Sequence, residues 1–410
     1  MARRSDSDID TSRFSHFDQS YAADPGGMWD ALRRSEQVPW SDQHGGFHVL
    51  ARYEQICAAA RDPELFCSGQ GNTIPPFPFP PLIPVNVDPP LLHQYRRLLT
   101  PYLTPAKVAE RRVEFAEIAD SLFKSFLEKA GTGATVDFIE EFAVPFPQQV
   151  ALRAIGFPEK DRETTARAVF DLSHLRGINE SVADSAAAQV IGRITELIEE
   201  RRSAPKRTDL IGVLLDAEID GRPLGDQELV FYIFLLLTGG LDTTTAATAG
   251  MFMYLGQHPG ERERLRGDPA LRRTATDEFV RWTSPVQGLA RTLTRDTEFH
   301  GCPMTSGGKV MLLWAAGNRD ADAFPDPDDV QLDRSPNHHL GFGMGPHRCL
   351  GSHLAKLMLD IAIERGLSWL GDFHVVDPDS LQWVGGETFG LKALPLRLGA
   401  APGSPSIGGR

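Results

Sequence analysis

The residue of this chain best placed to do chemistry is Cys349, which follows glycines at three alternate positions. Gly341, Gly343 and Gly345 allow a backbone to turn tightly and to approach a flat object closely, because glycine has no Cβ and tolerates positive φ. A helix-prone run begins at Ser352, so Cys349 is predicted to stand just before a helix N-terminus. Backbone N–H groups and the helix macrodipole favour an anionic sulfur there. A thiolate presented in this way can serve as a metal ligand.

Three other interpretations compete with a metal-binding thiolate. An isolated cysteine is commonly a small buried hydrophobic residue with no chemistry. Nearby histidines suggest zinc, but structural zinc sites usually bring thiolates in C-x2-C pairs, and Cys57, Cys67 and Cys302 lack that spacing. A dinucleotide-binding loop would need glycine at position 346, where proline stands. The glycine pattern therefore favours a ligand thiolate, with an inert buried cysteine as the main alternative.

The residues around this cysteine resemble the haem-binding loop of the cytochrome P450 superfamily. The matching pattern is Phe342-Gly343-x-Gly345-x-His347-x-Cys349-x-Gly351. The resemblance implies a haem b (iron protoporphyrin IX) whose iron is held by the Cys349 thiolate, and electron donation from that ligand favours O–O bond cleavage. It also implies that His347 bonds a haem propionate, that Phe342 packs beside the thiolate, and that Gly343 lets the loop approach the cofactor.

A second unusual stretch interrupts a long apolar segment that is predicted as a helix from Gln227 to about Gln257. The first half of this segment is apolar on all sides, which is typical of a buried helix. The stretch that follows is Thr238-Gly239-Gly240-Leu241-Asp242-Thr243-Thr244-Thr245. Each glycine inside a helix costs about 1 kcal/mol, and a buried Asp needs a partner. Such breaks usually serve function, although a kinked packing site with back-bonded threonines is the structural alternative.

The stretch also resembles the oxygen-activation motif of the cytochrome P450 family. By that resemblance, a kink at Gly239 opens room for dioxygen, the hydroxyl of Thr243 supports the oxygen bound there, and Asp242 links it to solvent protons. The chemistry would be general acid catalysis through a relayed proton. Asp242 and Thr243 are therefore the predicted catalytic residues.

Other charged residues match the family at positions with known roles. Arg96 and Arg291 match the two arginines that bind haem propionates, although the usual histidine four residues before Arg96 is Leu92 here. His93 stands one place further on, which turns a helical side chain by about 100°, so only Arg96 is carried over. A solvated basic patch is the alternative for Arg96.

Glu278 and Arg281 are three residues apart and share one face of a predicted helix. As a surface pair they would contribute less than about 1 kcal/mol. The family places such a pair in the interior together with a later arginine, which is Arg334 here. We therefore predict a buried structural ion cluster.

The candidate substrate contacts come from separate apolar stretches, including an uncharged, proline-rich loop from Thr73 to Pro84 that cannot be a regular helix or a central strand. The predicted pocket residues are Phe77, Phe79, Leu235, Thr238, Val286, Gln287, Thr388 and Phe389. No Arg or Lys is among them, and a carboxylate buried without a partner is strongly unfavourable. We expect a small-to-medium neutral hydrophobic substrate that receives at most one hydrogen bond, from Gln287, Thr238 or Thr388.

Composition limits the class of protein. Hydrophobic residues make up 41% and charged residues 24% of the 410 residues, which is ordinary for a globular protein. A net charge of −13 argues against nucleic-acid binding. Four scattered cysteines fit a reducing compartment. The N-terminal arginines are not followed by an apolar run, so we expect no signal peptide, no membrane anchor and a cytoplasmic monomer.

Apolar residues recur at helical spacing through the middle of the chain, and strands are predicted near Phe47 and between Leu289 and Leu313. The predicted fold is mainly α with a small β-rich region, the cytochrome P450 fold, with haem between the long distal helix and the cysteine loop. We expect a flexible segment at 1–24, a single catalytic domain at 25–400 and a flexible tail at 401–410.

The resemblance implies a haem-thiolate monooxygenase that hydroxylates or epoxidises its substrate with O2. No flavin or nicotinamide motif is visible, so the two electrons would come from a ferredoxin and its reductase. A basic surface of Arg96, Arg97, Arg348 and Lys356 would receive an acidic ferredoxin. The alternatives are an enzyme that uses peroxide or isomerises its substrate, and a haem sensor without turnover; the acid–alcohol pair at 242–243 counts against both.

Overall fold

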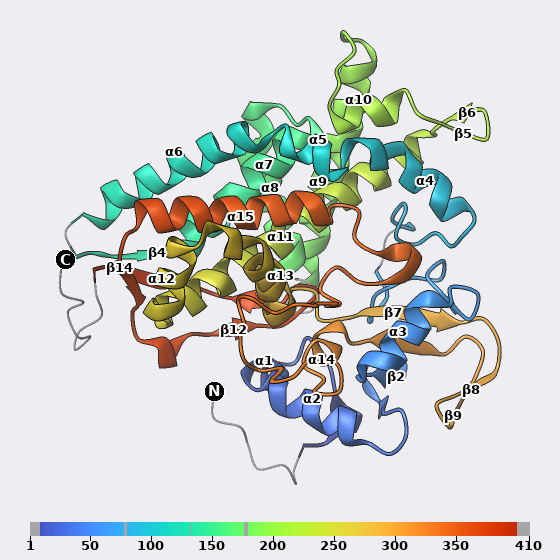
Figure 1. The fold of residues 1–410 in the computed structure, drawn as a ribbon. Coiled ribbons are helices and arrows are strands. Elements are labelled where there is room, and N and C mark those ends of the chain that lie inside the picture. Colours follow the sequence, from blue (N-terminus) through green and yellow to red (C-terminus); the bar gives the residue numbers. More distant parts are fainter. Residues whose placement is uncertain (1–8, 78–79, 132, 176–178, 400–410) are drawn as a thin grey trace.

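A large helical part and a smaller β-rich part lie side by side, with the five-stranded sheet and the N-terminal helices at the bottom and lower right of Figure 1. The computed structural model describes residues 9–77, 80–131, 133–175 and 179–399. This arrangement confirms the predicted fold class.

The α-helices are α1 (Gln19–Ala23), α2 (Pro25–Arg34), α3 (Tyr53–Arg61), α4 (Leu91–Leu99), α5 (Pro105–Ala109), α6 (Arg112–Ala130), α7 (Pro145–Ile155), α8 (Arg162–Leu175), α9 (Glu180–Arg202), α10 (Leu210–Leu215), α11 (Asp226–Gln257), α12 (Pro259–Gly267), α13 (Arg272–Thr283), α14 (Trp314–Gly317) and α15 (Ser352–Trp369). The strands are β1 (Trp40–Ser41), β2 (Phe47–Leu50), β3 (Phe66–Cys67), β4 (Thr135–Asp137), β5 (Glu218–Ile219), β6 (Arg222–Pro223), β7 (Leu289–Leu293), β8 (Thr297–Phe299), β9 (Cys302–Met304), β10 (Lys309–Leu312), β11 (Phe373–Val375), β12 (Trp383–Val384), β13 (Gly390–Leu391) and β14 (Pro395–Leu398).

Helix α11 connects two hydrophobic clusters of the helical part. Its first half, from Leu229 to Leu241, is buried with residues of α4, α7, α8, α9 and α10. Its second half, from Ala247 to Leu255, is buried with residues of α6, α13 and α15, and the ring of Phe252 stacks on that of Phe138 with centroids 4.3 Å apart. Because the helix is buried along most of its length, it fixes the relative positions of the elements around it.

The structure keeps residues 238–245 within α11, which runs through this stretch as the sequence predicts. The threonine hydroxyls bond back to the preceding turn. Thr238 donates to the Phe234 C=O at 3.1 Å, and Thr245 donates to the Leu241 C=O at 3.1 Å. These bonds let threonine continue the helix, which is the structural alternative considered above.

By length and composition alone, α11 is apolar enough to cross a membrane. However, 61% of its most apolar window is buried inside the protein, among the helices just described. That burial is typical of a core helix.

The main sheet has the strand order β1-β2-β10-β7-β3. Strand β10 is parallel to β2 and antiparallel to β7, and Arg291 of β7 lies opposite Val310 of β10. Arg291 therefore lies on an interior strand of the sheet, and its side chain is buried. A three-stranded sheet, β11-β14-β4, joins the C-terminal strands to the segment between α6 and α7.

The segment predicted to be flexible as far as residue 24 packs onto the domain from residue 9 onward. Phe14 and Tyr21 are buried, with ring centroids 5.3 Å apart, in one cluster with Trp29 and Phe47. The hydroxyl of Ser41 donates to the Phe14 C=O at 2.7 Å. Residues 9–24 therefore differ from the loosely held segment that the sequence predicts, because these aromatic rings find partners in β2 and α2. Residues 1–8 and the predicted tail at 401–410 lie outside the described residues.

Candidate active site

The loop that leads into α15 holds Cys349 through its backbone. The Cys349 N–H donates to the Phe342 C=O at 2.8 Å. Gly343 and Gly345 have φ values of 65° and 71°, and a Cβ on Gly345 would lie 2.0 Å from the carbonyl oxygen of Ala60. An L side chain is strained at such φ values. These two glycines therefore allow the turn that presents the cysteine.

The Cys349 side chain is exposed although protein surrounds the residue, so its sulfur faces an open space within the fold. Burial raises the pKa of the thiol, while a backbone bond from Gly351 and the charges of Arg96 and Arg348 act in the opposite direction. Helix α15 begins at Ser352, three residues after Cys349, as the sequence predicts, but in the protein alone desolvation outweighs the groups that favour the thiolate. Coordination to a metal would itself deprotonate the thiol.

Three basic side chains gather beside this loop, and we call them the Arg96–Arg291–His347 group. Arg291 is 3% exposed, donates to the Ala290 C=O at 2.7 Å and forms no ion pair within the described residues. The Nε2 atom of His347 is buried with no hydrogen-bond partner in the described part of the chain. Arg96 donates to the Arg348 C=O at 2.7 Å.

Burial and mutual repulsion act on the pKa values of this group. The pKa of His347 falls to about 3, first because of burial and then because of the charges of Arg291, Arg96 and His93. Burial lowers the pKa of Arg291 to about 10 and also lowers that of Arg96. Buried cations of this kind are unfavourable unless an anion joins them. The group is thus suited to a ligand that carries negative charge.

The middle of α11 offers open space on one face. Gly239 is exposed in the middle of α11, and a Cβ there would meet no atom within 4 Å. Thr243 lies four residues later on the same face and donates from Oγ1 to the Gly239 C=O at 3.0 Å. Asp242, its neighbour, is only 5% exposed. A flat ligand can therefore approach the helix at Gly239.

The cysteine loop borders the hydrophobic cluster to which this part of α11 belongs. Leu350, next to Cys349, packs against the cluster that contains Leu237 and Leu241. The open face at Gly239, the accessible sulfur and a basic group that can bind two carboxylates together fit a haem b, which is flat, bears two propionates and needs an axial ligand. Cys349 would supply that ligand, and Arg96, Arg291 and His347 would hold the propionates.

Glu278 forms the predicted buried cluster with two arginines. Both Glu278 and Arg281 are fully buried, and the Nε and Nη2 atoms of Arg281 donate to the carboxylate at 2.8 Å. Arg334 donates from Nε to the same carboxylate at 3.0 and 3.1 Å, and Asn337 and the backbone N–H of Gln331 add two further bonds. This carboxylate therefore ties α13 to the segment that precedes the cysteine loop.

Four of the predicted pocket residues, Leu235, Thr238, Val286 and Thr388, are half-buried. Phe77 is also half-buried, with its ring centroid 6.4 Å from that of Phe234 in α11. Phe79 lies outside the described residues. The proline-rich loop thus approaches α11 through Phe77.

Two other predicted pocket residues are corrected by the structure. Gln287 is 1% exposed, accepts a hydrogen bond from the Tyr21 hydroxyl and donates to the Ser284 C=O at 2.7 Å. Both ends of its amide are satisfied within the protein, so it cannot orient a substrate. Phe389 is 6% exposed and stacks on Trp383 with centroids 5.0 Å apart, which makes it a core residue.

Sequence reasoning missed a polar chain behind the cysteine loop. His339 accepts the Gly341 N–H at its Nδ1, 3.2 Å away, and its Nε2 lies 3.2 Å from Asp277. Asp277 also pairs with Lys356, whose ammonium is therefore not free for the predicted ferredoxin surface. Arg97 and Arg348 of that surface are exposed. The histidine directly before the glycines was the available sequence signal.

A metal held here by one thiolate beside a carboxylate-binding group is the arrangement of haem-thiolate proteins. A family model described as Cytochrome P450 matches residues 76–268 and 271–373. The chain belongs to the cytochrome P450 family.

Similar proteins extend over nearly the whole chain. A steroid C26-monooxygenase of Mycobacterium tuberculosis is 33% identical over 376 residues, which are 90% of this chain and 99% of that protein. A linalool 8-monooxygenase of Pseudomonas putida is 31% identical, covering 83% of this chain and 87% of that protein. The crystal structure of CYP108D1 from Novosphingobium aromaticivorans has a TM-score of 0.84 at 28% identity and covers 93% of this chain and 96% of that one.

A second solved structure, Mycobacterium marinum CYP268A2 in complex with pseudoionone, has a TM-score of 0.82 at 30% identity and covers 92% of this chain and 95% of that one. These matches confirm the predicted family, fold, haem cofactor and class of enzyme. The protein is a cytochrome P450 monooxygenase, which uses O2, a substrate and electron-transfer partners.

Proposed function

We propose that this monooxygenase hydroxylates or epoxidises a neutral, small-to-medium hydrophobic substrate, with electrons from a ferredoxin and its reductase, as a soluble cytoplasmic monomer. The observation that carries the proposal is that Leu235 and Thr238, which lie within about one turn of Gly239 on α11, are half-buried and uncharged, as are Phe77, Val286 and Thr388. Burying one aliphatic or aromatic group gains about 1.5–3 kcal/mol, whereas an unpaired buried carboxylate is strongly unfavourable. Names of similar proteins, which mention a steroid, linalool and pseudoionone, support the same class of molecule.

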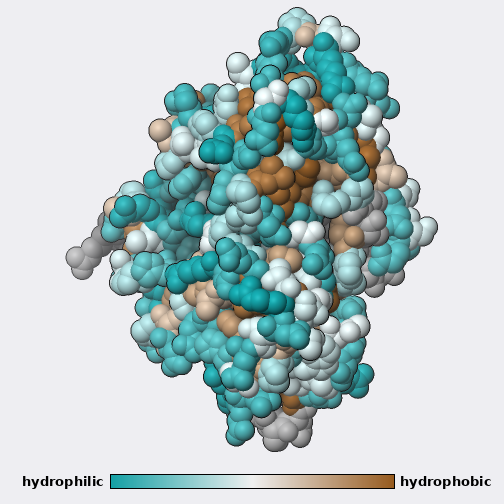
Figure 2. Space-filling view, turned by 90° about the vertical axis from the view of Figure 1, so that its right-hand side faces the viewer, coloured by the Kyte–Doolittle hydropathy of each residue, from teal (hydrophilic) through white to brown (hydrophobic). Residues whose placement is uncertain are grey.

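The molecular surface supports access for such a molecule. Figure 2 shows a hydrophobic patch, recessed between hydrophilic residues, in the upper half of the face that lies at the right of Figure 1. A contiguous apolar region on a soluble protein often marks a ligand-binding site. The patch therefore fits entry of an apolar substrate from this side.

In the proposed reaction the bound haem supplies oxygen activation at a thiolate-ligated iron. The chain itself would hold the cofactor through Cys349 and the Arg96–Arg291–His347 group. The pocket residues named above would place no charged side chain against the substrate. Thr243 holds a hydroxyl at the open face beside Gly239, and Asp242 stands next to it as a proton source. These two residues would deliver protons where oxygen is reduced.

Spectroscopy of the purified protein tests the substrate class. Neutral terpenoids, steroids and alkylbenzenes, titrated against the haem protein, should move the haem absorption from low to high spin as substrate displaces water. Small aromatic carboxylates serve as the comparison set. Tight binding of the carboxylates with no response to the neutral compounds would overturn the apolar-substrate proposal.

A pair of threonine variants tests the proton path. Thr243→Ala should keep haem and substrate binding but lower product formation by about tenfold or more, with electrons diverted to hydrogen peroxide. Thr245→Ala is the matched control, because Thr245 makes the same back-bond and points about 200° away around the helix. Product and hydrogen peroxide are measured per NADH consumed with a surrogate ferredoxin system. Equal coupling in Thr243→Ala and wild type would remove Thr243 from the proposed path.

A further inference from the structure

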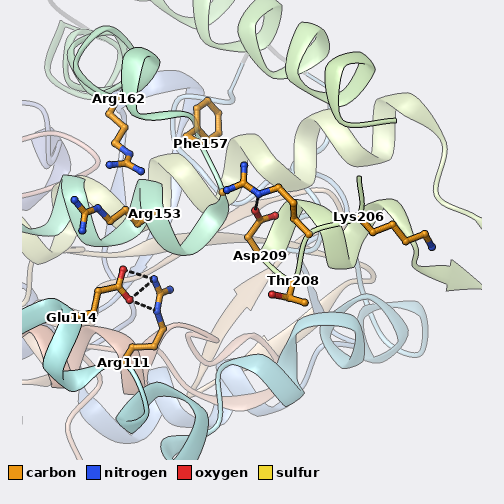
Figure 3. A pocket seen from close by; sticks show the side chains of 10 residues that line it. Arg111, Glu114, Arg153, Phe157, Arg162, Lys206, Thr208 and Asp209 are labelled. Atoms are coloured by element: carbon orange, nitrogen blue, oxygen red, sulfur yellow. Dashed lines mark hydrogen bonds and ion pairs between the residues drawn. The ribbon is translucent and has the colours of Figure 1, made fainter. Parts of the chain in front are cut away.

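A cavity of about 510 Å³ lies on the side of α7 away from α11, between α6, α8 and the segment that joins α9 to α10 (Figure 3). Ala151 marks the face of α7 that packs on α11, because a Cβ on Gly240 of α11 would lie 3.6 Å from the Cβ of Ala151. Arg153 follows two residues later, so its side chain points about 200° around the helix from Ala151, and it lines the cavity. Five basic and two acidic side chains line it, in a protein whose net charge is −13. Such a local excess of positive charge in an acidic protein suggests that the cavity binds an anion.

Both carboxylates of the lining already have partners. Glu114 accepts two hydrogen bonds from Arg111, at 3.0 and 3.1 Å. Asp209 pairs with Arg201, lies 3.5 Å from Nε of Arg207, and accepts the Gly212 N–H at 3.0 Å to cap α10. Both acids therefore make their hydrogen bonds and ion pairs with other groups, although the charge of Glu114 also acts on Arg162 and partly offsets the effect of burial on its pKa.

Arg153 and Arg162 are the cations left over. Figure 3 shows the guanidinium of Arg162 reaching from α8 toward the Arg153 side chain at one end of the cavity. The Nε atom of Arg162 is buried with no hydrogen-bond partner in the described part of the chain. Its one ion pair there is with Glu159, at 3.9 Å, and that side chain is 85% exposed. Arg153 has no ion pair or side-chain hydrogen bond within the described residues.

These two arginines also act on each other electrostatically. Burial lowers the pKa of Arg162, and the positive charge of Arg153 lowers it further. Two partly dehydrated guanidinium groups at one end of a cavity are unfavourable unless an anion joins them. The planar fork of a guanidinium matches the oxygens of a phosphate in a bidentate manner. A cavity of this volume is also within the usual range for small-molecule sites.

We propose that this cavity, the Arg153–Arg162 site, binds a small molecule through a diphosphate group. The ligand would sit outside the haem pocket, with its oxygens between the two guanidinium groups. The proposal does not depend on the substrate proposed above, because it concerns another side of α7 and is tested by binding rather than by turnover.

Isothermal titration of the haem-loaded full chain with inorganic pyrophosphate tests the site, with ionic strength held constant by sodium chloride. Wild type should show one saturable site per chain. Arg153→Gln and Arg162→Gln should each weaken binding by about tenfold or more, since each removes a charged hydrogen-bond donor. Arg153→Lys should fall between, because it keeps the charge and loses the fork.

Arg167→Gln is the matched control. Arg167 lies on the same helix as Arg162, is 77% exposed and pairs with Asp171 at 3.3 Å outside the cavity. This variant removes the same charge and should bind pyrophosphate like wild type. Tighter binding of ADP than of pyrophosphate would assign the diphosphate to a nucleotide, and equal binding would assign it to free diphosphate.

Thermal unfolding provides a second measurement, since a ligand that binds the folded state raises the melting temperature. Pyrophosphate should raise that of wild type and of Arg167→Gln, and raise that of the double variant Arg153→Gln/Arg162→Gln much less. The proposal fails if wild type shows no saturable binding, or if the double variant binds as tightly as Arg167→Gln.

Discussion

Two groups of buried arginines in this protein differ in whether a carboxylate accompanies them. Around Glu278, the side chains of Arg281 and Arg334 both donate to one carboxylate, at 2.8 to 3.1 Å. Near the cysteine loop, Arg291 is as deeply buried but forms no ion pair within the described residues, and the Nε2 atom of His347 has no hydrogen-bond partner there.

The difference distinguishes a group that stabilises the fold from one that is prepared for a ligand. Burial opposes ionisation of Glu278, but its bonds to Arg281 and Arg334 outweigh burial and lower the pKa of this carboxyl. In the other group nothing outweighs burial, and the pKa of Arg291 falls to about 10. A buried charge without a partner is unfavourable. We therefore propose that the cofactor supplies the anion that pairs with this group.

The largest expected effect comes from removing the shared carboxylate. Glu278→Ala leaves two buried guanidinium groups unpaired, which should lower the free energy of unfolding by about 3–5 kcal/mol. Urea unfolding of the haem protein, followed by far-UV circular dichroism, measures the loss. Glu263→Ala is the control, since Glu263 pairs with Arg266 at the surface and should contribute less than about 1 kcal/mol. Similar midpoints for the two variants would contradict the stabilising role.

The pH dependence of the same group has a defined sign. The folded pKa of Glu278 is below its ordinary value of 4.5, so its contribution to stability is present above that value and is lost as the pH falls through the folded pKa. Acid should therefore destabilise wild type more steeply than Glu278→Gln, in which the group cannot titrate. Urea midpoints of both proteins, measured from pH 6 down to pH 3, provide the check. If the two midpoints fell in parallel with pH, the predicted loss of stability on protonation of Glu278 would be wrong.

In the Arg96–Arg291–His347 group we expect a smaller effect on stability and a larger effect on haem retention. Arg291→Met removes an unpaired buried charge and should leave the melting temperature nearly unchanged, while haem leaves about tenfold to a hundredfold faster because a charged hydrogen bond is lost. Haem release is measured by transfer to excess apomyoglobin. Arg334→Met should behave in reverse, with lower stability and little change in haem release. If Arg291→Met lowered stability as much as Arg334→Met and kept its haem, the two groups would not differ as proposed.

Elements defined by local pattern could be predicted from the sequence. The strand from Leu289 to Leu293 and the long apolar helix that ends at Gln257 have the expected limits, because apolar periodicity and flanking Pro or Gly act over a few residues. The packing of Phe14 and Tyr21 could not be predicted in this way. Polar neighbours conceal them in the sequence, and the cluster that buries them includes Phe47 of a separate strand.

The candidate active site, like the fold, could be predicted from the sequence only where its geometry is local. The glycine and cysteine spacing predicts the loop geometry because φ at Gly343 and Gly345 is a local property. The role of Gln287 is not local, since its partner Tyr21 is 266 residues away, and nothing near position 287 indicates that both ends of its amide are satisfied. That Arg291 forms no ion pair within the described residues is likewise a property of the packed structure.

The smallest expected effect is on haem release and concerns Arg96, at the exposed edge of the proposed haem site. Arg96 is partly exposed and already donates to the Arg348 C=O at 2.7 Å, so its charge is less dependent on the cofactor than that of Arg291. Arg96→Gln should therefore speed haem release by only about threefold to tenfold. Arg97 is the matched control because it is exposed and points about 100° away around α4. Arg97→Gln should release haem at the wild-type rate, whatever it does to ferredoxin binding, since transfer to apomyoglobin involves no ferredoxin. Equal acceleration in both variants would mean that general positive charge on α4, rather than the position of Arg96, retains the cofactor.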